Sequence, residues 1–260
     1  MEAIISKSII ESFFKKLIAN LNLDCAIVGS GPSGLVCAYS LARAGIKTAI
    51  FEKRLKPGGG ITGGAMLFNE ILLPDSLSDF LSEMGIRYKK SEENPEFIVC
   101  DSVETAAALT YKAVHAGANI FNGITVEDLI FKNKKVSGIV INWTEVISAG
   151  LHVDPLAIEA KTVLDAGGHD AELTAKFAKK AGIKLNTKTG SIIGEKPMWA
   201  EEGEKSTIEN TAEVFPGLFV SGMAANSVFG SFRMGPIFGG MIYSGLKAAE
   251  LIISSLEQSY

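Results

Sequence analysis

Cysteine is scarce in this chain, with three residues among 260, and no two of them have the CxxC spacing of a metal or redox motif. Cys25 and Cys37 fall in apolar segments, so we expect them to be buried thiols. Cys100 leaves the total odd, which argues against a disulfide framework. These features favour a protein of the reducing cytoplasm.

Basic stripes and long apolar runs are absent as well. The net charge of −4 excludes the usual electrostatic footprint of a nucleic-acid binder. The longest apolar stretches are interrupted by glycine, proline or Arg233, so we expect no membrane span. Glu2, Lys7 and Glu11 stand where a secretion signal would need an apolar region, so none is expected.

The chain is long enough for one α/β domain with a substantial core, and it shows no repeats or low-complexity linkers. Apolar residues at helical spacing predict an amphipathic helix over 4–21. We therefore expect two parts, an added helix at 1–22 and a single compact domain at 23–260. The helix needs a partner for its apolar face, either the domain itself or another subunit. The face consists of Ile5, Ile9, Phe13, Leu17 and Leu21.

Residues 24–53 contain the strongest motif. An apolar run ending at Val28 leads into Gly29-Ser-Gly31-Pro-Ser33-Gly34, an alanine-rich helical stretch and a second apolar run that ends in Glu52. This is the strand–turn–helix–strand order of a dinucleotide-binding fold. Gly29 permits the tight turn, Gly31 permits close approach of a pyrophosphate, and Gly34 permits helix–strand packing. Glu52 is spaced to accept hydrogen bonds from a ribose.

The remaining pattern predicts an α/β fold around this unit. We expect a Rossmann-like dinucleotide-binding fold of the flavoprotein, glutathione-reductase-like type, because residues 211–223 resemble the late strand that closes the site in flavoproteins. A glycine-rich loop is expected at 57–64. Helices are predicted at 75–85, 101–116 and 235–256. Strands are predicted at 97–100, 119–121, 125–131, 136–142 and from 163 to 165, with the last at 219–221.

Two short segments carry the candidate chemistry, His152-Val153-Asp154-Pro155 and Gly168-His169-Asp170. Imidazole and carboxylate are ligands for Fe(II) or Zn(II), so the segments are compatible with a metal site. From spacing alone, caps and turns explain them better than a metal does, and Asp154 before Pro155 could simply start a helix. The third histidine, His115, is expected to be a cation at a helix C-terminus.

Taken together, these motifs resemble the thiamine thiazole synthase family. The resemblance runs in order from about residue 20 to 250 and includes Phe51-Glu-Lys53, Gly58-Gly-Gly60, the two histidine segments, Gly222-Met223 and Arg233-Met-Gly-Pro. It implies an enzyme that consumes NAD as a substrate. Nicotinamide is released, and ADP-ribose is combined with glycine and sulfur into an ADP-linked thiazole carboxylate.

One departure bears on the source of the sulfur. In the eukaryotic type, a cysteine before the Xaa-Asp-Pro donates its own sulfur, whereas this chain has His152 at that position. The chain therefore resembles the archaeal branch, which uses free sulfide and iron(II) and turns over repeatedly. The resemblance also implies a homo-octamer with metal sites where protomers meet.

The resemblance assigns roles to individual residues. His152, Asp154 and His169 are the implied catalytic residues, with Asp154 and His169 as the metal ligands and Arg233 as the partner of the glycine carboxylate. The implied nucleotide contacts are Gly29, Gly31, Ser33, Gly34, Glu52, Lys53, Gly60, Val126, His152, Val153, Asp154 and Met223.

Two other classes remain open at this point. A small FAD-dependent oxidoreductase would share the glycine motif, although the chain is short for a flavoenzyme with a separate substrate domain. A non-catalytic NAD- or metal-binding module would release no nicotinamide. A flavin spectrum in the purified protein would favour the first of these.

Overall fold

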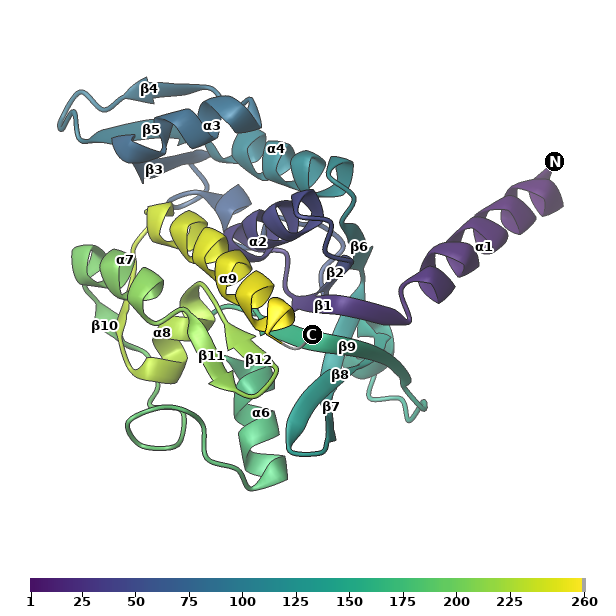
Figure 1. Cartoon of the computed structure of the whole chain (residues 1–260). Helices are drawn as coiled ribbons and strands as arrows, with labels where there is room; N and C mark the ends of the chain where they lie inside the picture. The colour runs from purple at the N-terminus through teal and green to yellow at the C-terminus, as the bar shows by residue number, and fades with distance from the viewer. Residues whose placement is uncertain (259–260) are drawn as a thin grey trace.

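A largely parallel sheet forms the centre of the structure, a computed structural model that describes residues 1–258 (Figure 1). Its main path has the order β11-β12-β9-β1-β2-β6, and only β11 runs antiparallel to its neighbour. This arrangement confirms the predicted α/β class. The strands are β1 (Asn22–Val28), β2 (Thr48–Glu52), β6 (Asn119–Asn122), β9 (Leu156–Asp165), β11 (Ala212–Phe215) and β12 (Leu218–Val220).

β9 is the longest strand of this path, and the sheet branches at it because two different strands pair along one of its edges. Along one edge it pairs with β1 from Glu159 to Asp165. Along the other edge its first residues pair with β8 (Lys135–Trp143), and its last three pair with β12. β8 forms a hairpin with β7 (Ile124–Lys132), as the two predicted strands implied. The start and the end of β9 therefore belong to different parts of the molecule.

Two apolar clusters cover the two faces of the sheet. Successive residues of β1 pack into one cluster and then the other, because successive side chains of a strand point to opposite faces. Cys25 and Ile27 join the cluster under α2 (Pro32–Arg43), whereas Ala26 joins the cluster on the opposite face. α9 (Gly239–Glu257) lies beside α2 on the first face (Figure 1).

A small antiparallel sheet sits next to these helices. Its order is β3-β5-β4. Asp101, the last residue of β5, caps the following helix α4 because its carboxylate accepts a hydrogen bond of 2.7 Å from the Glu104 N–H. The elements are β3 (Glu70–Pro74), α3 (Ser78–Met84), β4 (Tyr88–Lys90), β5 (Phe97–Asp101) and α4 (Ser102–His115), which ends at His115 as predicted.

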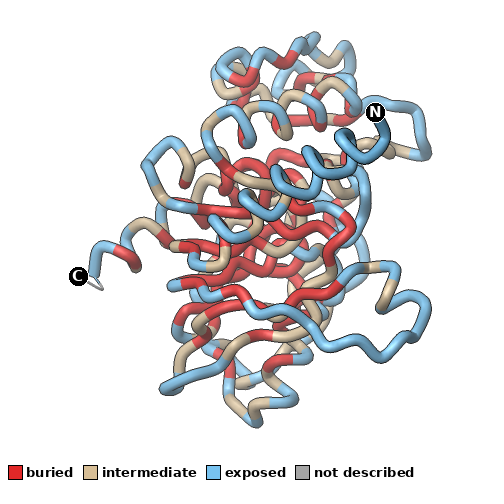
Figure 2. Tube along the Cα trace, turned by 90° about the vertical axis from the view of Figure 1, so that its right-hand side faces the viewer, coloured by how far each residue is buried: buried red, intermediate tan, exposed pale blue. Residues whose placement is uncertain are grey.

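Helix α1 (Glu2–Ala19) projects away from the rest of the chain, and its surface is largely exposed (Figures 1 and 2). Only its last turns are anchored: Phe13 stacks on Trp143 with a centroid distance of 6.2 Å, and the Lys16 amine donates to the Ile120 carbonyl at 2.8 Å. Ile5 and Ile9 remain 51 and 63 % exposed. The domain therefore covers only part of the predicted apolar face.

Several elements differ from the sequence prediction. β9 begins at Leu156 rather than near residue 163, and the Asp154-Pro155 pair starts no helix. A two-residue strand, β13 (Phe232–Arg233), follows the strand predicted to be the last. Elements not predicted are β3, β4, α5 (Thr144–Ser148), α6 (Glu172–Ala181), β10 (Lys196–Met198), α7 (Ala200–Glu209), α8 (Met223–Phe229) and a 3-10 turn, Ile61–Gly63. A second 3-10 turn, Asp75–Leu77, forms the start of the helix predicted at 75–85. Within residues 1–258, no helix is long and apolar enough to cross a bilayer.

Candidate active site

A cavity of about 700 Å³ opens beyond the carboxyl ends of β1, β2 and β9. This is where open parallel sheets bind their ligands, since the loops that follow the strands meet there. Most of the residues expected to contact nucleotide, glycine or metal line this cavity. They are Gly29, Gly31, Ser33, Glu52, Lys53, Gly60, Val126, His169, Met223 and Arg233.

The turn at the floor of the cavity requires glycine at two positions, because a side chain there would clash with the backbone. Gly29 has a φ of +97°, and a Cβ there would come within 2.5 Å of the Ala166 carbonyl oxygen. A Cβ on Gly34 would meet the Gly29 carbonyl oxygen at 2.3 Å. Nothing lies within 4 Å of the Cβ position at Gly31, which leaves that side of the turn open to the cavity. The N-terminus of α2 follows at Pro32 and favours negative charge.

Glu52 connects the end of β2 to this turn. Its carboxylate is buried and accepts from the Ser30 hydroxyl at 2.6 Å, from the Ser30 N–H at 2.8 Å and from the Arg54 N–H at 2.8 Å. Each carboxylate oxygen can accept more than one hydrogen bond, so Glu52 retains capacity toward a ligand in the cavity. The neighbouring Lys53 amine lies 3.6 Å from the Glu172 carboxylate.

Asp165, the last residue of β9, shapes the loop that carries His169. The buried carboxylate accepts from the Gly167 N–H at 3.0 Å, and from the N–H and hydroxyl of Thr174 at 3.1 and 2.6 Å. Burial raises the pKa of Asp165, although these hydrogen bonds oppose the rise. The loop between them contains Asp170 at φ +71°, a conformation that costs a non-glycine residue energy. Asp165 therefore fixes both ends of a strained loop.

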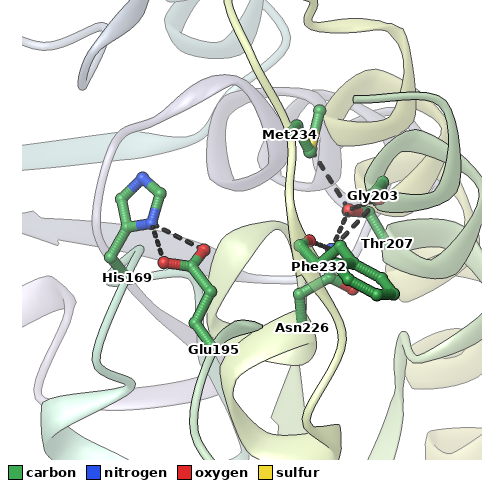
Figure 3. A network of polar contacts seen from close by, with 7 residues as sticks. All are labelled: His169, Glu195, Gly203, Thr207, Asn226, Phe232 and Met234. Atoms are coloured by element: carbon green, nitrogen blue, oxygen red, sulfur yellow. Dashed lines mark hydrogen bonds and ion pairs between the residues drawn. The ribbon is translucent and has the colours of Figure 1, made fainter. Parts of the chain in front are cut away.

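The His169 ring is half-exposed and faces a carboxylate from a distant segment (Figure 3). Its Nδ1 lies 2.9 and 3.1 Å from the two oxygens of Glu195. The second ring nitrogen points away from Glu195 (Figure 3). Because an ionised carboxylate can only accept, this contact favours the Nδ1–H tautomer, in which a neutral ring has its lone pair on Nε2.

Arg233 reaches the cavity from β13, which pairs with β10. Asn226 of α8 holds this segment in place. It is fully buried, and its amide donates to the Phe232 carbonyl at 3.1 Å, to the Gly203 carbonyl at 3.1 Å and to the Thr207 hydroxyl at 2.7 Å (Figure 3). The arginine side chain itself is exposed at the mouth of the cavity.

Four of the expected site residues do not line the cavity, namely Gly34, which packs behind the glycine turn, and three residues of one loop. His152, Val153 and Asp154 are exposed in the loop before β9, and the Val153 carbonyl accepts from the Asn142 amide at 3.0 Å. His169 follows the other end of the same strand. The fold of one chain therefore separates Asp154 from His169 instead of joining them.

No group of three or more His, Cys, Asp or Glu side chains in residues 1–258 is arranged to hold a metal ion. His169 with its Glu195 partner is nevertheless suited to metal binding, because ligating imidazoles usually donate their other N–H to a carboxylate. Sequence reasoning missed Glu195 and Asn226, for which no local motif gives a signal. Asp165 had a signal: an acidic residue at the end of a strand, directly before Ala166-Gly167.

The fold and the cavity together define an α/β protein with the glycine turn of the dinucleotide-binding class. The model of the Thi4 family matches residues 6–238, and the chain belongs to this family. It is 54 % identical over 256 residues, 98 % of each chain, to the thiamine thiazole synthase of Pyrococcus horikoshii. It is 53 % identical to that of Pyrococcus abyssi, again over 98 % of each. The crystal structure of Thermovibrio ammonificans THI4 superposes with a TM-score of 0.96, at 51 % identity over 99 % of each chain.

Proposed function

We propose that this chain converts NAD, glycine and free sulfide into ADP-5-ethyl-4-methylthiazole-2-carboxylate, with release of nicotinamide, in an iron(II)-dependent reaction of many turnovers. Membership of the Thi4 family supports the coarser part, an enzyme of thiamine thiazole synthesis. The observation that carries the finer part is one cavity that joins the glycine turn, His169 and Arg233.

The glycine turn and Glu52 would hold the ADP half of NAD. The open side of Gly31 and the start of α2 offer N–H groups to the pyrophosphate, and the Glu52 carboxylate accepts from the ribose. Met223 and Val126 line the same cavity and supply apolar contact. This half of the site binds and orients NAD so that the nicotinamide ribose extends toward His169.

Arg233 would bind the carboxylate of glycine. A guanidinium presents a planar fork of donors that matches a carboxylate with two parallel hydrogen bonds. The backbone on either side of Arg233 is fixed, since the Asn226 amide holds the Phe232 carbonyl and the Trp199 N–H donates to the Arg233 carbonyl at 3.1 Å. The amino group of glycine is thereby aimed into the cavity.

His169 and Asp154 would hold the iron(II), which when bound supplies a soft, redox-active centre that binds HS⁻ beside an electrophilic carbon. The free Nε2 of His169 fits this role. Asp154 lies beyond the far end of β9, so the aspartate would come from another copy of the chain. The homo-octamer implied by the family resemblance provides such a copy.

The sulfur would come from solution. His152 has no sulfur to donate, and none of the three cysteines lines the cavity. All three are buried, and burial raises the pKa of Cys25 and of Cys100 to about 12, so neither forms the reactive thiolate near neutral pH. A polypeptide sulfur donor within the chain is therefore unsupported.

Anaerobic incubation with NAD, glycine, Fe(II) and sulfide tests the proposal. We expect free nicotinamide and an ADP-linked thiazole by mass spectrometry, in excess of one product per chain. Omission of sulfide should stop product formation, and the polypeptide mass should be unchanged after turnover. A loss of roughly 34 Da from the protein, one H₂S, would show that the chain donates its own sulfur.

A further inference from the structure

The carboxylate of Glu195 is placed to control the His169 ring, although 26 positions separate the two residues. Both oxygens of Glu195 lie within 3.1 Å of Nδ1, and the Glu195 side chain is only 20 % exposed, against 50 % for the imidazole. Within residues 1–258, Glu195 is the only partner of this ring among the hydrogen bonds and ion pairs found. The pair joins the loop that follows β9 to the segment that precedes β10.

The backbone that carries Glu195 is held on both sides. The Gly194 N–H donates to the Ser227 carbonyl at 2.9 Å, and the Lys196 N–H donates to the Ser231 carbonyl at 2.9 Å. Glu195 is therefore presented from a fixed segment, next to the strand β10 that pairs with β13. Asp165 fixes the loop of His169 in the same way. A hydrogen bond between two fixed segments loses little conformational entropy when it forms.

We propose that Glu195 is the positioning residue of His169. It accepts the Nδ1–H, selects the tautomer with the lone pair on Nε2, and turns that lone pair into the cavity. Glu195 directly precedes β10, which pairs with the strand that carries Arg233. The contact therefore also fixes the position of His169 relative to Arg233. The inference rests on the proposed role of His169 as a metal ligand, and extends it to a residue outside the predicted ligand set.

The test is the affinity of the full-length oligomer for Fe(II) alone, measured by anaerobic titration calorimetry. Removal of an outer partner of a ligating histidine typically weakens metal binding about 10- to 100-fold, so this loss is expected for Glu195→Ala. Glu195→Gln retains an acceptor oxygen and should remain within about threefold of wild type. Glu92→Ala, an exposed glutamate between β4 and β5, is the matched control and should bind as wild type does.

NAD affinity separates positioning from general damage and should be unchanged in all three variants. If Glu195→Ala binds Fe(II) as tightly as wild type while His169→Ala does not bind it, the role of Glu195 is overturned but His169 remains the proposed ligand. Equal losses of Fe(II) and NAD in both Glu195 variants would also overturn it, because they indicate a structural defect. Full Fe(II) binding by His169→Ala would overturn the proposed ligand as well as the inference.

Discussion

Asp154 and His169 lie beyond opposite ends of the same ten-residue strand, β9. At about 3.3 Å per residue, such a strand separates its ends by roughly 30 Å. His169 lines the cavity, whereas Asp154 is exposed in a loop near the apolar residues Leu151, Val153 and, at the start of β9, Leu156, which are 61, 48 and 55 % exposed. A site that contains both side chains therefore needs two copies of the chain.

This separation predicts complementation between inactive variants. Asp154→Ala and His169→Ala should each be inactive alone, because each lacks one ligand in every site. Co-expressed in equal amounts, they should form mixed oligomers in which about a quarter of the sites combine an intact Asp154 with an intact His169. Nicotinamide release by the purified mixture measures the recovery. A mixture as inactive as its components would contradict the shared site.

Removal of the Asn226 amide should loosen the segment of Arg233. Asn226→Ala removes a donor from the Phe232 carbonyl, from the Thr207 hydroxyl and from the Gly203 carbonyl, which keeps the Thr207 hydroxyl as a donor; the loss should lower the free energy of unfolding by about 2–4 kcal/mol. Because Arg233 is the proposed glycine anchor, the KM for glycine should rise more than the KM for NAD. Urea unfolding and initial rates measure the two effects.

Ser254→Ala is the matched control, because it removes a single exposed hydrogen bond of 2.9 Å at the far end of α9. It should change neither KM nor stability by a measurable amount. An Asn226→Ala enzyme with unaltered KM for glycine would show that Arg233 does not depend on this contact.

The largely buried carboxylate of Glu204, in α7, should make the free energy of unfolding of the protein depend on pH. One oxygen accepts from the Gly240 N–H at 2.6 Å, and the other is buried without a partner. Burial raises the pKa of Glu204 from 4.5 to about 7. The folded state therefore binds more protons than the unfolded state between these values, and stability falls as pH rises from 4.5 to 7. At about 1.4 kcal/mol per unit, the loss amounts to about 3 kcal/mol.

Glu204→Gln should remove this dependence, since an amide does not ionise. The variant should unfold at the same urea concentration as wild type near pH 4.5 and at a higher concentration at pH 8, if other groups contribute equally to both proteins. Parallel pH profiles for the two proteins would mean that the Glu204 carboxylate is not perturbed.

Substitutions in the exposed half of helix α1 should affect the assembly of the protein without affecting the fold of the single chain. Ile5→Glu with Ile9→Glu places charge on side chains that contact nothing in the domain, so the fold and the NAD affinity should persist. Light scattering should show a smaller particle if α1 covers an apolar surface of a neighbouring subunit. Phe13→Ala is the comparison, because Phe13 packs on Phe121 and Trp143 within the chain and should mainly reduce stability. A particle of the same size in the double variant and in wild type would exclude the exposed half of α1 from assembly.

The sequence pattern was enough to predict the dinucleotide-binding half of the molecule, because the residues that shape it lie close together in the chain. Gly29, Gly34 and Glu52 act within a single strand–turn–helix–strand unit, where spacing alone sets which backbone atoms approach. Helix α4 was also predicted within a residue at each end, including its end at His115, whereas its cap at Asp101 was not predicted. The long strand β9 was predicted only from residue 163, although buried Ile158 and Ala160 alternate with exposed Glu159 and Lys161 in its first half.

The sequence by itself determined the glycine turn, the acidic end of β2, and the identity of the side chains able to bind metal and carboxylate. Only the tertiary structure decided which of them meet. Glu195 contacts His169 and Asn226 holds the segment of Arg233 through pairings between distant strands and helices, which no local spacing encodes. The extended backbone of β9 keeps Asp154 away from His169, because a strand of ten residues cannot bring its two ends together.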